Sequence, residues 1–336
     1  MLSGINVVLM LEVSVNVRPR VHLGLVSMHR RAPRRNGGIG FAIEGPEAEI
    51  RALEADQLVV YDDRPHPMPP SELDQLSLCL ERFVSSHGLA RRAAIRIGGD
   101  MRTHVGMGSA TAIRLGAIES LALLNQARIP ADRLVAASGR GGTSGAGVNT
   151  YFSGGLVCDL GRPNDGTPYA PSSQIAPTRP PLALPVVTMP SWPVLLCIPR
   201  AVAPKTQQQE IAFFERTTPL PAAASFEASY IALFELYAAA AEGDYPAFCQ
   251  GVRRMQQTAW KRAEYDAYGE ALPLLTAELL NAGADCVGMS SLGPMLFCLT
   301  KSSRFGVIKD RAAALGCDVY PTLPSPVGRT VTLINA

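Results

Sequence analysis

Residues 104–124 read HVGMGSATAIRLGAIESLALL, a glycine-rich turn that runs without a break into an apolar segment. Gly106 and Gly108 let the backbone approach a ligand closely and adopt positive φ, and Ser109 stands where a helix N-cap belongs. A helix that begins here points its unpaired N–H groups and the positive end of its dipole into the turn. The stretch predicts a phosphate or diphosphate site, while a purely steric strand-to-helix turn remains an equal interpretation of the glycines alone.

Two better-known phosphate motifs are excluded by the same residues. No lysine follows the last glycine, as a Walker P-loop would require. The third glycine of a dinucleotide fingerprint is missing, and no acidic residue closes a following strand at the expected distance. A phosphate ligand of this turn would therefore be bound by neither of these two motifs.

Composition indicates a globular protein. The 336 residues are 47% hydrophobic and 18% charged, which leaves room for two domains. A formal net charge of +2 gives no broad basic field, so we expect no nucleic-acid partner. No run reaches the roughly 18 apolar residues of a membrane span, so we expect no membrane partner. The seven cysteines are scattered singly, which is typical of reduced thiols in the cytoplasm.

Periodicity along the chain alternates strands and helices. The apolar start is expected to open a strand at 5–17 rather than an export signal, because it lacks a basic region and carries Glu12 and Asn16. Further strands are expected at 21–26, 39–43, 93–97, 155–160, 194–198 and 317–320, with a strand-turn-strand pattern at 286–300. Helices are expected at 71–87, from 109 onward, and at 130–138, 207–217, 222–242, 246–263, 270–282 and 302–315. The proline-rich stretch 162–190 indicates a long connection or domain boundary.

Five stretches spread over the chain resemble one known family. GMGSAT at 106–111 and GMSSLGP at 288–294 are similar to the second and third motifs of the GHMP kinase superfamily. RVHLGL at 20–25, RRNGGIGFAI at 34–43, HVGMGSAT at 104–111 and GRGGTSGAGVNTYFSGGLVCDLG at 139–161 resemble one branch, the β-ribofuranosylaminobenzene 5′-phosphate synthases of methanopterin biosynthesis.

The resemblance implies an α+β, two-domain GHMP-kinase-like fold. Its N-terminal domain (1–165) would resemble ribosomal protein S5 domain 2 and carry the phosphate turn, and its C-terminal domain (166–336) would be ferredoxin-like. The resemblance also implies a cytoplasmic, homodimeric, Mg²⁺-dependent enzyme that joins 4-aminobenzoate to 5-phosphoribosyl 1-diphosphate, with loss of CO₂ and pyrophosphate. Such a reaction needs positioning and charge stabilisation more than a strong base.

The resemblance also assigns roles to residues. Arg34 precedes the Asn-Gly-Gly of the first motif, and its guanidinium could grip a carboxylate or phosphate; with Arg140 and Ser144 it is a candidate catalytic group. Asp159 is the candidate metal ligand. The candidate substrate and phosphate-binding residues are Arg20, His22, Asn36, Gly37, Gly38, His104, Gly106, Gly108, Ser109, Ala110, Thr111, Gly141, Thr143, Gly145, Ser290, Ser291 and Gly293. For His22, His104 and the second turn, a purely structural role stays open.

Two alternative functions remain at this point. The first is an ATP-dependent small-molecule kinase of the same superfamily; against it, Arg102 stands where those kinases usually carry a proline, and the GRGGTSGAG block is absent from them. The second is a catalytically silent ligand-binding relative, because Ser27 occupies the position of the family's acidic residue after the first Gly-Leu pair.

Overall fold

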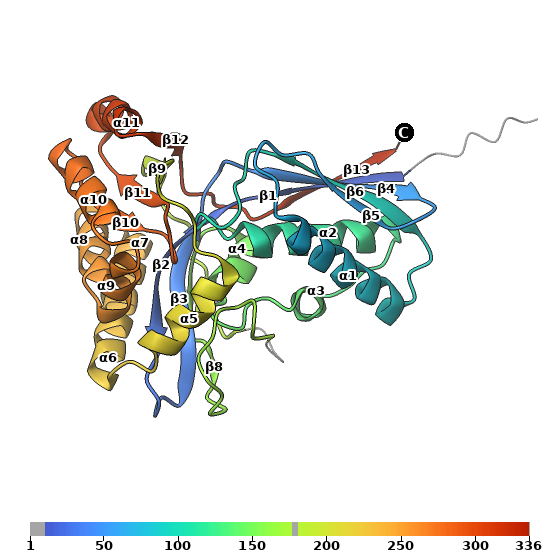
Figure 1. Cartoon of the computed structure of the whole chain (residues 1–336), viewed down its shortest axis with the longest axis horizontal. Helices are drawn as coiled ribbons and strands as arrows, with labels where there is room; N and C mark the ends of the chain where they lie inside the picture. Colours follow the sequence, from blue (N-terminus) through green and yellow to red (C-terminus); the bar gives the residue numbers. More distant parts are fainter. Residues whose placement is uncertain (1–10, 177–180, 336) are drawn as a thin grey trace, which may run out of the picture.

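The computed structural model describes residues 11–176 and 181–335 as a mixed α/β molecule with three sheets and helices packed on their faces (Figure 1). The first sheet has the order β13-β1-β4-β6-β5 and is antiparallel except for the β5–β6 pair. Its strands are β13 (Thr330–Asn335), β1 (Leu11–Val17), β4 (Ala48–Ala55), β6 (Arg92–Gly99) and β5 (Val59–Asp62).

One face of this sheet is covered by the helix that follows the glycine turn. That helix, α2 (Ser109–Leu124), packs across β1 and β4, with α1 (Pro70–His87) and α3 (Ala131–Ser138) beside it (Figure 1). Gly116 permits the close approach, because a Cβ there would lie 2.9 Å from the Val17 side chain. The alternating burial along β4 follows from this one-sided cover.

The second and third sheets form the rest of the molecule. The second contains β2 (Arg20–Ser27), β3 (Arg34–Ala42) and β7 (Leu156–Asp159), and β8 (Arg162–Pro163) pairs with the start of β3. The third has the order β10-β11-β9-β12, with strands β10 (Cys286–Met289), β11 (Leu296–Leu299), β9 (Val194–Pro199) and β12 (Cys317–Thr322). Helix α4 (Ala146–Ser153) packs on β2 and β3, which are buried almost along their whole length.

The remaining helices belong to the C-terminal half. Helices α6 (Ala222–Tyr230) and α7 (Ala238–Glu242) join through the π-helical segment η1 (Ile231–Tyr237) and, with α8 (Tyr245–Gln256), pack near β2 and β10. The others are α5 (Gln207–Thr217), α9 (Ala259–Asp266), α10 (Ala271–Asn281), the 3₁₀ turn η2 (Ser302–Arg304) and α11 (Phe305–Ala314). No helix of the described residues is long and apolar enough to cross a membrane.

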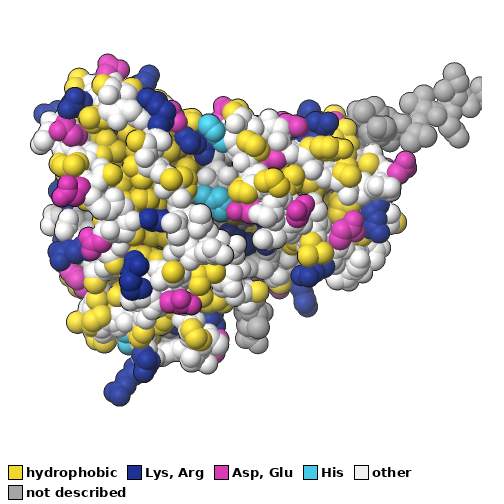
Figure 2. Space-filling model, in the orientation of Figure 1, with side chains coloured by type: hydrophobic (Ala, Val, Ile, Leu, Met, Phe, Trp, Pro, Cys, Tyr) yellow, Lys and Arg dark blue, Asp and Glu magenta, His cyan; other side chains and the backbone are white. Residues whose placement is uncertain are grey.

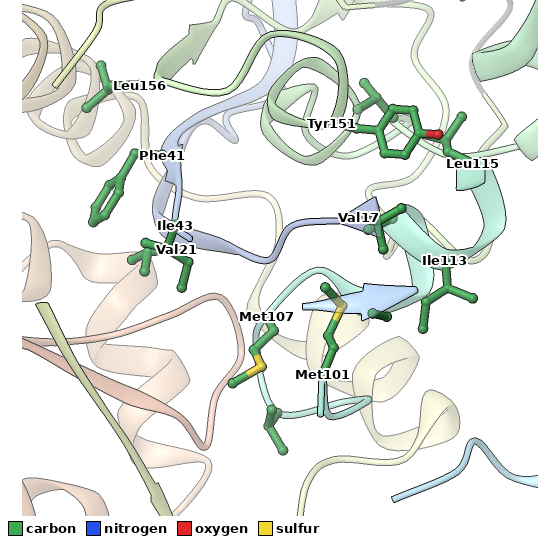
Figure 3. Close-up of a cluster of buried hydrophobic side chains, with 14 of the residues drawn as sticks. Val17, Val21, Phe41, Ile43, Met101, Met107, Ile113, Leu115, Tyr151 and Leu156 are labelled. Atoms are coloured by element: carbon green, nitrogen blue, oxygen red, sulfur yellow. The ribbon is translucent and has the colours of Figure 1, made fainter. Parts of the chain in front are cut away.

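The largest hydrophobic core ties the glycine turn to the sheets. Val17, Val21 and Phe41 from the strands and Ile113 from α2 are fully buried. Figure 3 shows Met101 and Met107, from the segment before α2, among these buried side chains. The packing of Met101 and Met107 into this core therefore holds the glycine turn, and with it the backbone N–H groups of the turn, in place.

Several sequence expectations are corrected by the structure. Residues 246–263 are not one helix, because the chain breaks between α8 and α9 at Gln257 and Thr258. Ser109 is the first residue of α2 rather than its N-cap; Gly108 is the N-cap, in the left-handed conformation. Strands β4, β5, β8 and β13 and helix α4 were not expected.

Two further expectations keep their status. Residues 5–10 of the expected first strand lie outside the described residues, and β1 covers the rest. The domain division at 165/166 stays a prediction; β13, at the C-terminal end, pairs with β1 in the first sheet.

Candidate functional site

A pocket of about 220 Å³ opens over the glycine turn. Its floor is the N-terminus of α2, where Gly108 caps the helix without a side-chain hydrogen bond and no acidic residue stands in the first turn. Thr111 and Ala112 bond back to Gly108, which leaves the backbone N–H groups of Ser109 and Ala110 without an intrahelical partner. These groups and the helix dipole favour an anion in the pocket.

Two glycines are required by this geometry. Gly106 has φ +101°, and a Cβ there would lie 2.3 Å from the carbonyl oxygen of Ser290. Gly108 has φ +75°, and its Cβ would press on the Arg20 side chain at 3.1 Å. The turn thus brings its backbone against Arg20 and against the 288–294 segment, which L side chains at these positions would prevent.

Three arginines line the pocket beside the turn, and none of them pairs with a carboxylate among the described residues. Arg20 donates to the Gly106 carbonyl at 2.5 Å, Arg140 to Thr111 Oγ1 at 3.2 Å and Arg114 to the Ser138 carbonyl at 3.3 Å. Burial, followed by the neighbouring Arg140, lowers the pKa of Arg20 to about 10, and burial with Arg114 does the same for Arg140. Mutually repelling cations held together in this way indicate a site that is completed by an anion.

A hydrogen-bonded chain stands behind one wall. Ser144 Oγ donates to Asp159 Oδ2 at 3.0 Å and lies 3.2 Å from His22 Nε2. Asp159 also accepts from the backbone N–H groups of Gly145 and Gly161. Burial lowers the pKa of His22 well below its usual value, so its ring is neutral, and burial raises the pKa of Asp159 to about 6. Asp159 thereby anchors the second turn and orients Ser144 and His22.

The 288–294 turn closes the pocket from the C-terminal half. Ser290 Oγ donates to the Gly106 carbonyl at 2.7 Å and accepts from the His22 backbone N–H. The buried Lys261 donates to the carbonyls of Met289 and Ser291 and forms an ion pair with Glu264 at 2.5 Å. This pair therefore holds the turn in place over the glycines.

The opposite wall combines acidic and aromatic groups. His104 Nε2 lies 2.6 Å from Glu72 Oε1, and this contact raises the pKa of His104. Glu210 lines the same side. Next to it, Phe214 packs edge-to-face on Trp260 with ring centroids 5.0 Å apart, beside Leu25 and Leu292. One pocket therefore offers cations, a carboxylate-bearing rim and an aromatic surface.

Most of the residues singled out in the sequence lie in this pocket. Its lining includes Arg20, His22, His104, Gly106, Gly108, Ser109, Ala110, Thr111, Arg140, Gly141, Thr143, Ser144, Ser291 and Gly293. Ser290 and Gly145 lie directly behind the lining and bond to it or to its anchor.

The first motif supports the pocket without lining it. Arg34 donates to the carbonyls of Leu160 and Gly161, so its guanidinium is engaged within the protein, and its catalytic role stays a prediction. Asn36 donates to the Gly142 carbonyl at 2.9 Å, and Gly37 and Gly38 lie against the 159–161 backbone and the His22–Ser144 pair. Asp159 has no exposed surface and both of its carboxylate oxygens accept internal hydrogen bonds, so the structure shows it as an anchor, and its role as a metal ligand stays a prediction. Ser27 donates to the Arg34 carbonyl and also lies outside the lining.

Several lining residues were missed in the sequence. They are Glu72, Arg114, Glu210, Phe214, Trp260 and Glu264. The pairs 210/214 and 260/264 share a helix face at i, i+4 spacing, but every amphipathic helix carries such pairs. Only the placement of α5 and α9 distinguishes these two.

Two proteins named β-ribofuranosylphenol 5′-phosphate synthase are similar to the chain over most of its length. The one from Archaeoglobus fulgidus is 30% identical over 289 residues, which cover 86% of this chain and 88% of that protein. The one from Methanothermobacter thermautotrophicus is 28% identical over 303 residues, which cover 87% and 90%. No model of a known protein family matches the chain.

Solved structures share the fold at low identity. Homoserine kinase from Cytophaga hutchinsonii has a TM-score of 0.66 at 16% identity, covering 99% of both chains. Mevalonate kinase from L. major, in complex with R-mevalonate, has a TM-score of 0.68 at 14% identity, covering 93% of this chain and 95% of that one. These likenesses confirm the expected α+β fold of the GHMP kinases.

Proposed function

The chain belongs to the β-ribofuranosylphenol 5′-phosphate synthase family, and we propose that it joins a para-substituted benzoate to 5-phosphoribosyl 1-diphosphate, releasing CO₂ and pyrophosphate. Members of this family are synthases, so the chain is an enzyme. The relatives' names contain a phenol, which favours 4-hydroxybenzoate beside the 4-aminobenzoate expected from the sequence. The observation that carries the proposal is the juxtaposition of three unpaired arginines with an aromatic wall over the α2 N-terminus.

The leaving diphosphate is proposed to lie over the glycine turn. The free N–H groups of Ser109 and Ala110 and the guanidinium of Arg20 would donate to its oxygens. Arg20 Nε is buried with no hydrogen-bond partner among the described residues, so it has a donor to offer. Donors already in place where negative charge develops lower the barrier to departure of the diphosphate.

Arg114 and Arg140 are proposed to hold the 5-phosphate rather than the aryl carboxylate. Decarboxylation turns the carboxylate into neutral CO₂, so a cation bound to it would stabilise the reactant more than the transition state. A phosphate keeps its charge throughout and gains from both guanidinium groups. The aryl ring and its carboxylate would then lie along the apolar Phe214, Trp260 and Leu292, where burial favours loss of the carboxylate's charge.

The ring carbon that carries the carboxylate is proposed as the nucleophile. Electron release from the para substituent makes it attack ribose C1 as the diphosphate leaves, and loss of CO₂ then restores the aromatic ring. The chain contributes positioning and fixed charges. The neutral His22, held by Ser144, places a polar but uncharged group near the ribose.

Magnesium stays a proposal. No group of three or more His, Cys, Asp or Glu residues suited to a metal ion occurs among the described residues, and Asp159 is internally bonded. These residues do not fit a metal held by the protein itself, so no step above depends on one.

A cytoplasmic homodimer is also proposed. The seven free cysteines support a reducing compartment. An exposed row of aromatic side chains runs along α6 and η1, with a basic loop at one end and the acidic end of a helix at the other. If two copies of the chain packed antiparallel along this row, the basic end of each copy would meet the acidic end of the other. The row is Phe226, Tyr230 and Phe234, and the flanking charges are Arg30, Arg31, Glu242 and Asp244. Figure 2 shows positive and negative side chains interspersed over the face of the molecule that it views.

The test is release of labelled CO₂ from carboxyl-labelled 4-hydroxybenzoate or 4-aminobenzoate in the presence of phosphoribosyl diphosphate and Mg²⁺. Stoichiometric CO₂ and pyrophosphate are expected with at least one of the two acids. ATP consumption with a small alcohol and no CO₂ would instead identify a kinase. Binding of phosphoribosyl diphosphate without turnover would identify a silent relative.

A further inference from the structure

Three carboxylates line the pocket, and they differ in what they contact. Glu72 Oε1 contacts His104 Nε2 at 2.6 Å, and Glu264 accepts from Lys261 and from Trp260 Nε1. The Glu210 carboxylate has no hydrogen-bond or ion-pair partner among the described residues. It is therefore the carboxylate of this pocket that is available to a ligand.

Local structure fixes where Glu210 points. Helix α5 starts with a complete capping box, in which Thr206 and Gln209 bond each other's backbone N–H groups. Glu210 lies one turn before Phe214 on the same face, and both line the pocket. Because Phe214 packs on Trp260, the free carboxylate lies beside the aromatic surface that we assign to the aryl ring.

The charged groups around Glu210 come from several elements. Burial raises its pKa, and Glu72 of α1 adds to this effect, while His104 before α2 and Arg140 before α4 oppose it. The pKa of Tyr268, after α9, lies above its usual value mainly through burial, and the charge of Glu210 adds to this shift. A carboxylate shifted upward in this way takes up a proton more readily than one in water.

We propose that Glu210 is the catalytic proton acceptor for the hydroxyl or amino group at the para position of the aryl acid, an inference that rests on the proposed function. The aryl acid is thereby assigned to a class: benzoates whose para substituent carries a removable proton. A para ether or tertiary amine would meet the carboxylate without a hydrogen to share with it.

The step balances as follows. The ring carbon bearing the carboxylate bonds to ribose C1 while the bond from C1 to the diphosphate oxygen breaks. The ring becomes cationic, and its para O–H or N–H proton passes to the Glu210 carboxylate, which leaves a neutral dienone or imine. Loss of CO₂ returns the electron pair of the ring–carboxylate bond to the ring, and the para atom recovers its proton from Glu210.

The competing pocket groups are less suited to this role. Glu264 already accepts from Lys261 and Trp260, and its carboxylate is only 4% exposed. His22 is 6% exposed and engaged with Ser144, on the side of the pocket next to Arg20. Glu72 is held by His104.

The experiment compares Glu210→Gln with Glu215→Gln, a control on the exposed side of the same helix. With 4-hydroxybenzoate, kcat of Glu210→Gln should fall at least about 100-fold, the usual effect of losing a proton acceptor. The wild-type kcat should decline as pH falls through the raised pKa of Glu210, and this acid limb should be absent in the variant. The inhibition constant of 4-methoxybenzoate and the affinity for phosphoribosyl diphosphate should stay within about twofold, because neither involves the para proton.

Each other outcome overturns the inference in a recognisable way. Turnover by Glu210→Gln within about threefold of wild type, or persistence of the acid limb, would remove Glu210 from the chemistry. Loss of 4-methoxybenzoate or phosphoribosyl diphosphate binding in the variant would show a structural role instead. If the wild-type protein releases no CO₂ from either benzoate, the proposed function itself fails. This failure is distinct from a failure of the Glu210 proposal, because it is seen without any variant.

Discussion

Replacing Gly106 by alanine should damage both the stability and the site of this protein. At φ +101° an L residue is strained by about 1–3 kcal/mol. The new Cβ would lie 2.3 Å from the Ser290 carbonyl oxygen, whereas ordinary contact begins at 3.4 Å, so the 288–294 turn must retreat by 3.4 − 2.3 = 1.1 Å. That movement loosens the 2.7 Å hydrogen bond from Ser290 to Gly106, worth about 0.5–1.5 kcal/mol. The free energy of unfolding should fall by about 2–4 kcal/mol in total.

Urea unfolding and a CO₂-release assay measure the two effects separately. Displacing the turn by roughly 1 Å should reduce kcat/KM about 100-fold, because the donors no longer meet the diphosphate. Gly306→Ala is the matched control: this glycine lies in α11 at an ordinary φ with no atom within 4 Å of the added Cβ, so the change should raise stability by about 0.5–1 kcal/mol. Wild-type stability and turnover in Gly106→Ala would refute the close packing of the two turns.

Three further predictions follow from other contacts. The folded-state pKa of His104 lies above its unfolded value of 6.5, so the Glu72–His104 contact should stabilise the protein fully below pH 6.5 and lose this effect as pH rises through the raised pKa. Glu72→Gln should abolish that part of the pH dependence in urea titrations, and an unchanged profile would contradict it. Lys261→Met leaves Glu264 buried without its ion-pair partner and should lower the free energy of unfolding by about 3–5 kcal/mol. The double variant Lys261→Met/Glu264→Gln should recover most of this loss in urea unfolding. Equal stability of the single and double variants would contradict the pairing. Phe234→Glu, in the exposed aromatic row, should convert a dimer into monomers in sedimentation velocity, and a monomeric wild type would refute the proposed face.

The sequence located the pocket better than it assigned roles within it. GMGSAT and GMSSLGP could be recognised because glycines at positive φ leave a local signature, and the structure brings the two turns together at Gly106 and Ser290. The sequence could not show that the Arg34 guanidinium is bonded to the Leu160 and Gly161 carbonyls, because those contacts join segments remote in sequence. Short strands such as β5 were missed because their pairing partners are remote in sequence.

Glu210 and Trp260 illustrate a second limit. Each is an ordinary member of an amphipathic helix. Only the placement of α5 and α9 brings their side chains into the pocket over the glycine turn. No local pattern could identify them, because their role depends on contacts between segments about 100 to 150 residues apart.

The reaction explains why the pocket is assembled from both halves of the chain. Two phosphate groups require cations and backbone donors, whereas a carboxylate that must leave as neutral CO₂ requires apolar surroundings. A single loop cannot supply both environments within one small cavity. Here Arg20, Arg114 and Arg140 come from segments before residue 141, and Phe214, Trp260 and Leu292 come from segments after residue 213. The buried Lys261–Glu264 pair connects the two halves of the pocket. Lys261 holds the 288–294 turn through the Ser291 carbonyl, and Ser290 of that turn bonds the Gly106 carbonyl of the glycine turn.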